Sequence, residues 1–193
     1  QTIQGLSSAL EEIHISDLTA WCTAEHSYKN HCLQNAGLYL NGELLTDLRI
    51  PDDCNAISAH AFSHYGKLKS VTMPEGFTSI GDYAFQHCTN LESILLSNSL
   101  ESIGRDCFFG CSSLRMVAIP ESVTMLDYNA FGGCTTLMRF YGKYASECGR
   151  YLVRDNEIIA YAGGTVAYRS GITVSDDYDE NVTLTLDSSG VDL

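Results

Sequence analysis

Positive charge is scarce in this sequence of 193 residues. It holds 11 Lys and Arg against 24 Asp and Glu, which gives a formal net charge of −13 at pH 7. Nucleic-acid binding needs clustered Lys and Arg that contact phosphates, so we expect no nucleic-acid partner. An anionic membrane surface would repel such a chain. No apolar run approaches the roughly 18 residues that a membrane-spanning helix needs, so we expect no membrane insertion either.

Catalytic and cofactor signatures are also missing. The sequence contains none of the patterns GxGxxG, GxxxxGK[ST], HExxH and GxSxG, which mark dinucleotide, phosphate, zinc and serine-nucleophile sites. We therefore expect no enzymatic activity and no cofactor. The chain begins with Gln1 rather than Met, and we expect a processed form from which any signal peptide has been removed.

Proline is rare as well, and its three occurrences lie at multiples of 23 residues from one another. The same period appears in residues 68–136, which divide into three segments of 23 residues that align without a gap. We call each set of equivalent positions a column. The clearest columns are Leu68, Leu91 and Leu114; Val71, Ile94 and Val117; Ile80, Ile103 and Leu126; Phe85, Phe108 and Phe131; Cys88, Cys111 and Cys134; the prolines Pro51, Pro74 and Pro120 form another. A fixed period of this length predicts a solenoid of stacked units. A weaker copy begins at Leu45, with Tyr65 in the cysteine column, and a fifth begins at Leu137.

Each repeat is predicted to begin with a short strand. In the copy from Leu68, period-two alternation points Val71 and Met73 into the core and Ser70 and Thr72 outward. The proline that follows ends the strand because it cannot donate to a ladder. The Ile80 column predicts a second extended piece, and the DYAFQHC segment predicts one or two turns held by packing.

Two columns in the turns need separate interpretation. Gly81 and Gly104 share a column with Ser58 and Asp127, so we expect that turn to tolerate residues other than glycine. His60 and His64 are four residues apart, a spacing that can hold a metal ion on one face, and His87 shares the column of His64. Glycines continue that column, so we favour solvated turn residues and expect no metal site.

The sequence contains eight cysteines, and columns account for five of them. Three form the cysteine column, Cys107 lies in an alanine column and Cys54 lies in an apolar column. We expect buried free thiols there, because equivalent side chains in stacked repeats point in parallel, which is poor geometry for a disulfide. The others are Cys22, Cys32 and Cys148, and a Cys22–Cys32 disulfide is one alternative for the first two.

Residues 1–44 are predicted to form an N-terminal cap made of a helix and a β-hairpin. The segment 1–14 shows no clear pattern. Ser16 is a candidate N-cap for the helix that follows, and Trp21 lies on its apolar face, where it can plug the open end of the core. The segment 38–45 reads LYLNGELL, in which Asn41-Gly42 is typical of a type I′ hairpin turn. We expect this hairpin to lead into the first repeat strand and to cover its edge.

The repeats occupy residues 45–144, and residues 145–193 follow a different pattern. The segment 149–164 reads as a C-terminal β-hairpin with Asp155-Asn156 near its turn. Residues 170–193 form an acidic tail with six carboxylates and no Lys or Arg. This part is either a short cap or the beginning of another module.

The outward strand positions form a candidate binding surface. They are Asp47, Arg49, Ser70, Thr72, Ser93, Leu95, Met116, Ala118, Arg139 and Tyr141. This surface is polar at its N-terminal end and becomes apolar through Leu95, Met116, Ala118 and Tyr141, with Arg139 at the rim. Exposed apolar area rimmed by charge is typical of binding sites. The alternative is that the C-terminal segment folds over the surface and buries it.

The repeat pattern L-x-x-V-x-I-P-x-x-V-x-x-I-G-x-x-A-F-x-x-C resembles the BspA-type leucine-rich repeats of bacterial cell-surface proteins. The resemblance implies an α/β repeat solenoid, a right-handed leucine-rich-repeat superhelix with 23-residue repeats. It also implies an extracellular or cell-surface location and a non-enzymatic module for adhesion that binds a protein or an extracellular matrix ligand. A structural spacer or stalk that presents another domain is the alternative function.

Overall fold

The computed structural model describes residues 2–3, 10–26, 32–127, 129–137 and 139–142, and for residues 2–3, 32 and 139–142 it describes the backbone alone. The C-terminal hairpin and acidic tail expected over residues 145–193 lie outside the described residues.

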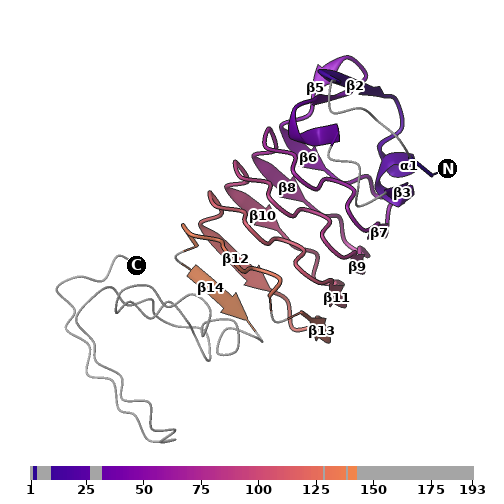
Figure 1. Cartoon of the computed structure of the whole chain (residues 1–193). Coiled ribbons are helices and arrows are strands. Elements are labelled where there is room, and N and C mark those ends of the chain that lie inside the picture. The colour runs from indigo at the N-terminus through magenta and orange to yellow at the C-terminus, as the bar shows by residue number, and fades with distance from the viewer. Residues whose placement is uncertain (1, 4–9, 27–31, 128, 138, 143–193) are drawn as a thin grey trace, which may run out of the picture.

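Each 23-residue repeat forms one coil that contributes a strand to a parallel five-stranded sheet. The strands are β6 (Asp47–Arg49), β8 (Ser70–Thr72), β10 (Ser93–Leu95), β12 (Met116–Ile119) and β14 (Arg139–Gly142). They pair in the spatial order β14-β12-β10-β8-β6, so the strands of successive coils are neighbours in the sheet (Figure 1). Ser70 pairs with Asp47 on one side and with Ser93 on the other, one full repeat away in each direction. The predicted period and register are confirmed.

A second parallel sheet has one short strand from each coil. Its strands are β7 (Ala56–Ile57), β9 (Ser79–Ile80), β11 (Ser102–Ile103) and β13 (Met125–Leu126). This confirms the second extended piece predicted from the Ile80 column. A turn joins the two strands of each coil, in which the residue three positions after each proline donates a backbone hydrogen bond to the proline carbonyl. Ser97 replaces proline in one coil, and the same hydrogen bond forms there from Leu100.

The third side of each coil is a run of hydrogen-bonded turns, as predicted for DYAFQHC. Backbone amides bond to the next coil here too: Phe62 donates to Ala84 at 2.8 Å and Phe85 donates to Cys107 at 2.9 Å. Two columns of these turns adopt positive φ. The first contains His60, Tyr83 and Asp106, and the second contains His64, His87, Gly110 and Gly133. Within the described residues, the only α-helix lies in the N-terminal cap.

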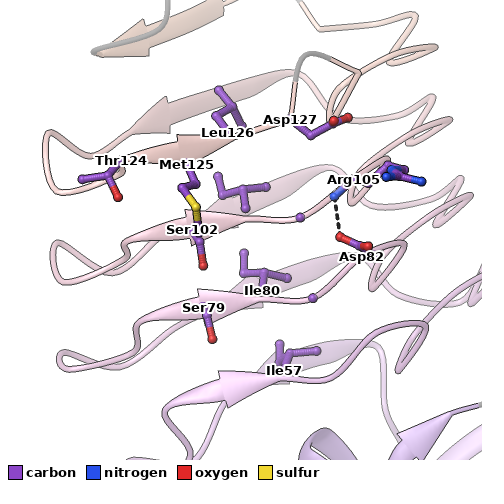
Figure 2. Close-up of a pocket in the computed structure, with 13 residues that line it drawn as sticks. Ile57, Ser79, Ile80, Asp82, Ser102, Arg105, Thr124, Met125, Leu126 and Asp127 are labelled. Carbon is purple, nitrogen blue, oxygen red and sulfur yellow. Dashed lines mark hydrogen bonds between the residues drawn. The ribbon is translucent and has the colours of Figure 1, made fainter.

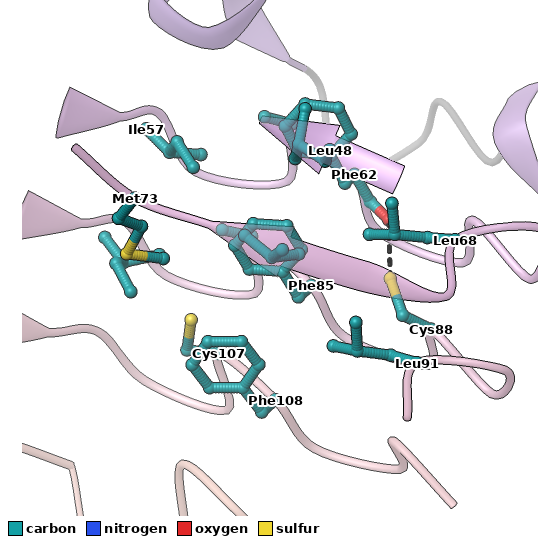
Figure 3. Close-up of a cluster of buried hydrophobic side chains, with 14 of the residues drawn as sticks. Leu48, Ile57, Phe62, Leu68, Met73, Phe85, Cys88, Leu91, Cys107 and Phe108 are labelled. Carbon is teal, nitrogen blue, oxygen red and sulfur yellow. Dashed lines mark hydrogen bonds between the residues drawn. The ribbon is translucent and has the colours of Figure 1, made fainter. Parts of the chain in front are cut away.

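A column of stacked phenylalanines runs through the core (Figure 3). The ring centroids of Phe62, Phe85, Phe108 and Phe131 are successively 5.4, 5.3 and 5.2 Å apart, and adjacent rings are within 9° of parallel. All four side chains are buried. The prediction that the Phe column is buried and stacked one repeat apart is therefore confirmed.

The cap helix α1 (Leu18–Thr23) closes the N-terminal end of the core. Its N-cap is Asp17, so the assignment to Ser16 was wrong by one residue. Asp17 is extended, and its carboxylate accepts a hydrogen bond of 2.9 Å from the Ala20 amide, which satisfies a free donor of the first turn. Trp21 is buried as expected, and its indole Nε1–H donates to the carbonyl of Ala61 at 3.1 Å.

The predicted hairpin is present as β4 (Gly37–Leu40) and β5 (Glu43–Leu44). Asn41 and Gly42 have φ of 53° and 89°, as a type I′ turn requires. The hairpin leads into β6 but belongs to a separate sheet, whose third strand is β2 (Glu12–Ile15), parallel to β4. A further parallel pair joins β1 (Thr2–Ile3) to β3 (Glu25–His26). The segment before Ser16, in which the sequence showed no pattern, therefore contributes two strands.

The glycine column allows less freedom than expected. A Cβ on Gly81 would lie 2.5 Å from the Ala59 amide nitrogen, and a Cβ on Gly104 would lie 2.6 Å from the Asp82 nitrogen. The tolerance prediction is wrong at these two positions, because adjacent coils approach too closely there. The amide of Asp127, in the same column, makes a longer hydrogen bond to the preceding coil (3.3 Å) than the amides of Gly81 and Gly104 (2.8 and 2.9 Å).

Candidate functional site

The candidate binding surface lies on the five-stranded sheet, and we call it the strand face. It consists of the ten outward positions named above. Leu95 is 64% exposed and Met116 is 51% exposed, and Ala118 is also exposed. Val117 and Ile119 are buried. Because side chains alternate along the pleat of β12, those of Met116 and Ala118 point outward.

The register places the five predicted binding residues on three consecutive strands. Met116 pairs with Ser93 and Arg139, and Ala118 pairs with Tyr141. The backbone of β14 therefore lies beside the exposed residues of β12. The side chains of Arg139 and Tyr141 lie outside the described residues, so their membership of the site stays a prediction.

One irregularity falls inside this surface. Strand β12 pairs with β14 over four residues, but with β10 over the single pair Ser93 and Met116. The coil that contains β10 lacks the proline that ends the strand in other coils. Ser97 takes the place of that proline, and both Ser97 and the preceding Leu96 are buried. Leu95 is thus presented at the point where the ladder is shortest.

The N-terminal end of the strand face is polar, as predicted. The Asp47 carboxylate accepts hydrogen bonds from the Ser70 hydroxyl at 2.6 Å and from the Thr46 hydroxyl at 2.9 Å. These hydrogen bonds, that of Ser70 most of all, lower the pKa of Asp47. Arg49 is exposed beside this cluster. The surface therefore changes from polar to apolar along the stack.

Sequence reasoning missed a second candidate site, an open groove of about 680 Å³ along the four-stranded sheet. Figure 2 shows its hydroxyl-bearing rim at Ser79, Ser102 and Thr124 and its charged rim at Asp82 and Arg105. Asp82 has a structural role there, because its Oδ1 accepts a hydrogen bond of 2.8 Å from the Arg105 amide. Met125 is 65% exposed in this groove. The sequence signal was a methionine in a column that holds serine at positions 79 and 102.

Each turn histidine lies against an aromatic ring of the neighbouring coil: His60 stacks on Tyr83, His64 is tilted against His87, and His87 meets Phe109 edge-on. The ring centroids of His60 and Tyr83 are 4.9 Å apart and nearly parallel, and those of His64 and His87 are also 4.9 Å apart. All three histidines are half-buried. Among the residues that the structure describes, no group of three His, Cys, Asp or Glu could hold a metal ion. These positions therefore have a packing role.

The column cysteines are buried free thiols, as predicted. The thiols of Cys88, Cys111 and Cys134 each donate to a phenylalanine carbonyl at 3.2 Å, that of Phe62, Phe85 and Phe108 respectively. Burial raises the pKa of all three, in the case of Cys134 to about 12. Such thiols are poor nucleophiles at neutral pH.

The alternative of a Cys22–Cys32 disulfide is not supported. Cys22 is a buried free thiol, and burial raises its pKa. Its thiol neighbour is Cys54, also free, with which it shares a hydrogen bond. Helix α1 packs against β7, and this contact brings together two cysteines that are distant in the sequence.

Stacked 23-residue coils with apolar columns and a parallel sheet on one side define a leucine-rich-repeat solenoid, a class of protein-interaction or structural modules. The family described as "BspA type Leucine rich repeat region" matches residues 35–148 in six copies. This match covers more than half of the chain, and the chain belongs to that family.

Two solved structures of bacterial proteins resemble this chain. The chain is similar to a leucine rich cell surface protein from Faecalibacterium prausnitzii A2-165, with 28% identity and a TM-score of 0.54, over 68% of this chain and 41% of that one. It is also similar to the pneumococcal vaccine antigen PcpA, with 27% identity and a TM-score of 0.49, over 53% of this chain and 25% of that one. The chain thus spans less than half the length of either protein. A comparison with curated proteins gave no match.

No helix in the described part of the chain is both long enough and apolar enough to cross a bilayer.

Proposed function

We propose that the chain is a non-enzymatic protein-binding module that engages its partner through the strand face. The observation that carries this proposal is the exposure of Leu95 and Met116 on adjacent strands of one sheet. Large apolar side chains at 64% and 51% exposure leave apolar area of this sheet face in water, which favours burial against a partner. The binding residues are Leu95, Met116 and Ala118, together with Arg139 and Tyr141 on β14.

The proposed setting is the cell surface or the extracellular space, with adhesion to a protein or extracellular matrix ligand as the role. Two facts support it. The chain belongs to the BspA-type repeat family, and the solved structure that it matches at a TM-score of 0.54 is described as a cell surface protein.

A spacer that presents another domain is the second candidate. It is favoured by the regularity of the stack, in which the strands of successive coils pair in parallel with a constant offset of 23 residues, and by the 41% share of the Faecalibacterium prausnitzii protein that the chain spans. A spacer requires no exposed apolar patch, so the two functions differ in what Leu95 and Met116 do.

The deciding experiment measures capture of the chain on a panel of immobilised extracellular matrix proteins. Wild type is compared with the Leu95→Ser/Met116→Ser double variant and with Met125→Ser, which removes a methionine that is 65% exposed from the other sheet. A binding module loses capture in the double variant and keeps it in the control. No capture of any of the three proteins supports the spacer, and equal capture of all three shows that binding does not use the strand face.

A further inference from the structure

Charge is partitioned between two sides of the coils. The first side comprises the residues that lead into and form strands β6, β8, β10 and β12, at 45–49, 67–72, 90–95 and 113–118, and we call it the strand side. It carries four basic residues, Arg49, Lys67, Lys69 and Arg115, and two acidic ones, Asp47 and Glu92, for a net charge of +2. The rest of the coils through residue 136 carries eight acidic residues and one basic residue, for a net charge of −7. A strongly acidic protein thus presents one cationic side.

The four basic residues of the strand side outnumber its two carboxylates. Asp47 accepts hydrogen bonds from the hydroxyls of Ser70 and Thr46, and the charge of Lys69 adds to the lowering of its pKa. Glu92 lies between Lys69 and Arg115, one coil from each. Among the described residues, no carboxylate lies within 4.0 Å of the charged group of any of these four basic side chains. The four basic side chains of the strand side are all exposed. Their charge is available to a partner.

The same side carries the exposed apolar residues of the strand face. Arg115 directly precedes Met116 in the chain, and Lys69 directly precedes β8. A polyanion without apolar groups would match these cations but would leave Leu95 and Met116 in water. A neutral apolar segment would cover the two side chains but would gain nothing from the cations. A segment in which carboxylates flank apolar side chains satisfies both.

We propose that the partner of the strand face is an acidic protein segment with interspersed apolar side chains. This inference rests on the proposed function and specifies the chemistry of the partner. Complementary charge raises the association rate and excludes basic partners, whereas Leu95 and Met116 supply the buried contact.

The test selects a displayed library of random 12-residue peptides against the full 193-residue chain, and the enriched peptides are synthesised. We expect them to carry net negative charge and at least two large apolar residues. Their affinity should fall about tenfold or more between 50 and 300 mM NaCl, because salt screens exposed charges. The Lys69→Glu/Arg115→Glu variant should weaken them by a similar factor. The matched variant Arg105→Glu, which reverses an exposed charge on the other side, should change affinity less than twofold.

Other outcomes overturn the inference in distinguishable ways. Neutral or basic peptides whose binding is lost in Leu95→Ser/Met116→Ser would leave the proposed function standing and make the partner class wrong. Enriched peptides insensitive to both double variants would overturn the function as well. Heparin binding that depends on Lys69 and Arg115 but not on Leu95 and Met116, without enrichment of acidic peptides, would identify a polyanionic polysaccharide. A dimer in sedimentation that Lys69→Glu/Arg115→Glu dissociates would identify a second copy of the chain as the occupant.

Discussion

The hydroxyl of Tyr65 donates a hydrogen bond of 2.7 Å to the carbonyl oxygen of Leu45. The same hydroxyl accepts a hydrogen bond of 3.2 Å from the Leu38 amide. Tyr65 occupies the position that cysteine holds in the next three coils, and it is fully buried. A cysteine side chain there is too short to reach the Leu38 amide and the Leu45 carbonyl. The tyrosine therefore links the hairpin of the cap to the first coil.

Tyr65→Phe should therefore lower the free energy of unfolding by about 1–3 kcal/mol, because it leaves a buried amide and a buried carbonyl without a partner while the ring volume is retained. Urea unfolding followed by circular dichroism measures the change. Tyr39→Phe, on a half-buried ring of the cap, is the control and should change stability by less than about 0.5 kcal/mol. A neutral result for Tyr65→Phe would mean that water replaces the hydroxyl.

Phe108→Ala should cost about 3–5 kcal/mol, because it removes a fully buried ring that stacks on Phe85 and Phe131. Phe131→Ala should cost no more than this, since that ring is slightly exposed near the end of the described stack. Thermal unfolding of the two variants compares them. A greater loss for Phe131→Ala would show that the C-terminal part of the chain packs on the last coil.

The buried thiols should resist alkylation in the native state and make the protein sensitive to high pH. Cys88, Cys111 and Cys134 should react with iodoacetamide at pH 7 only after denaturation. Their raised pKa means that, above about pH 8.5, the unfolded chain loses protons that the folded chain keeps. Stability should therefore fall as the pH rises from about 8.5 to 12, by about 1.4 kcal/mol per pH unit for each such thiol. Cys134→Ala should make this dependence of stability on pH less steep by the contribution of one thiol, about 1.4 kcal/mol per pH unit.

Gly104→Ala should destabilise the solenoid by about 1–3 kcal/mol, because its Cβ would lie 2.6 Å from the backbone of the preceding coil. Gly66→Ala is a matched control, since the nearest atom to its Cβ would be the Thr89 hydroxyl at an ordinary 3.4 Å. Differential scanning calorimetry of both variants measures the contrast. Equal melting temperatures would show that the coils can move apart at Gly104.

Tyr141→Ala should weaken partner binding by about 2 kcal/mol, because aromatic residues near the centre of an interface carry much of its free energy. The melting temperature should change little if the side chain belongs to the binding surface. Ser70→Ala, at the polar end of the strand face, should leave binding nearly unchanged. A large drop in the melting temperature of Tyr141→Ala would place this ring in the core and favour the spacer.

Sequence reasoning succeeded where structure repeats. The Phe column, the inward Val71 and the outward Met116 all follow from equivalent positions in stacked coils, because identical neighbours impose identical packing. It failed where a single contact decides. The N-cap moved from Ser16 to Asp17 since both residue types cap helices well and only the chain path selects one of them. The parallel pairing of β2 with β4 joins segments that are separated by the whole cap helix, and no local pattern indicates it.

The candidate site was predicted only in part. Alternation predicted the exposure of Leu95 and Met116, but the groove beside Met125 is lined by residues of four successive coils, and their arrangement around it was not predicted. The stacking of His60 on Tyr83 likewise requires two left-handed turns to align across adjacent coils.

The sequence by itself determined the 23-residue coil and the composition of its core. These features are periodic, and a periodic pattern is readable along the chain. Only the tertiary structure decided how closely the coils approach at Gly81 and Gly104, and which groups Tyr65 reaches in the cap. Those features depend on distances across the stack, which arise from the packing of all coils together and not from any one of them.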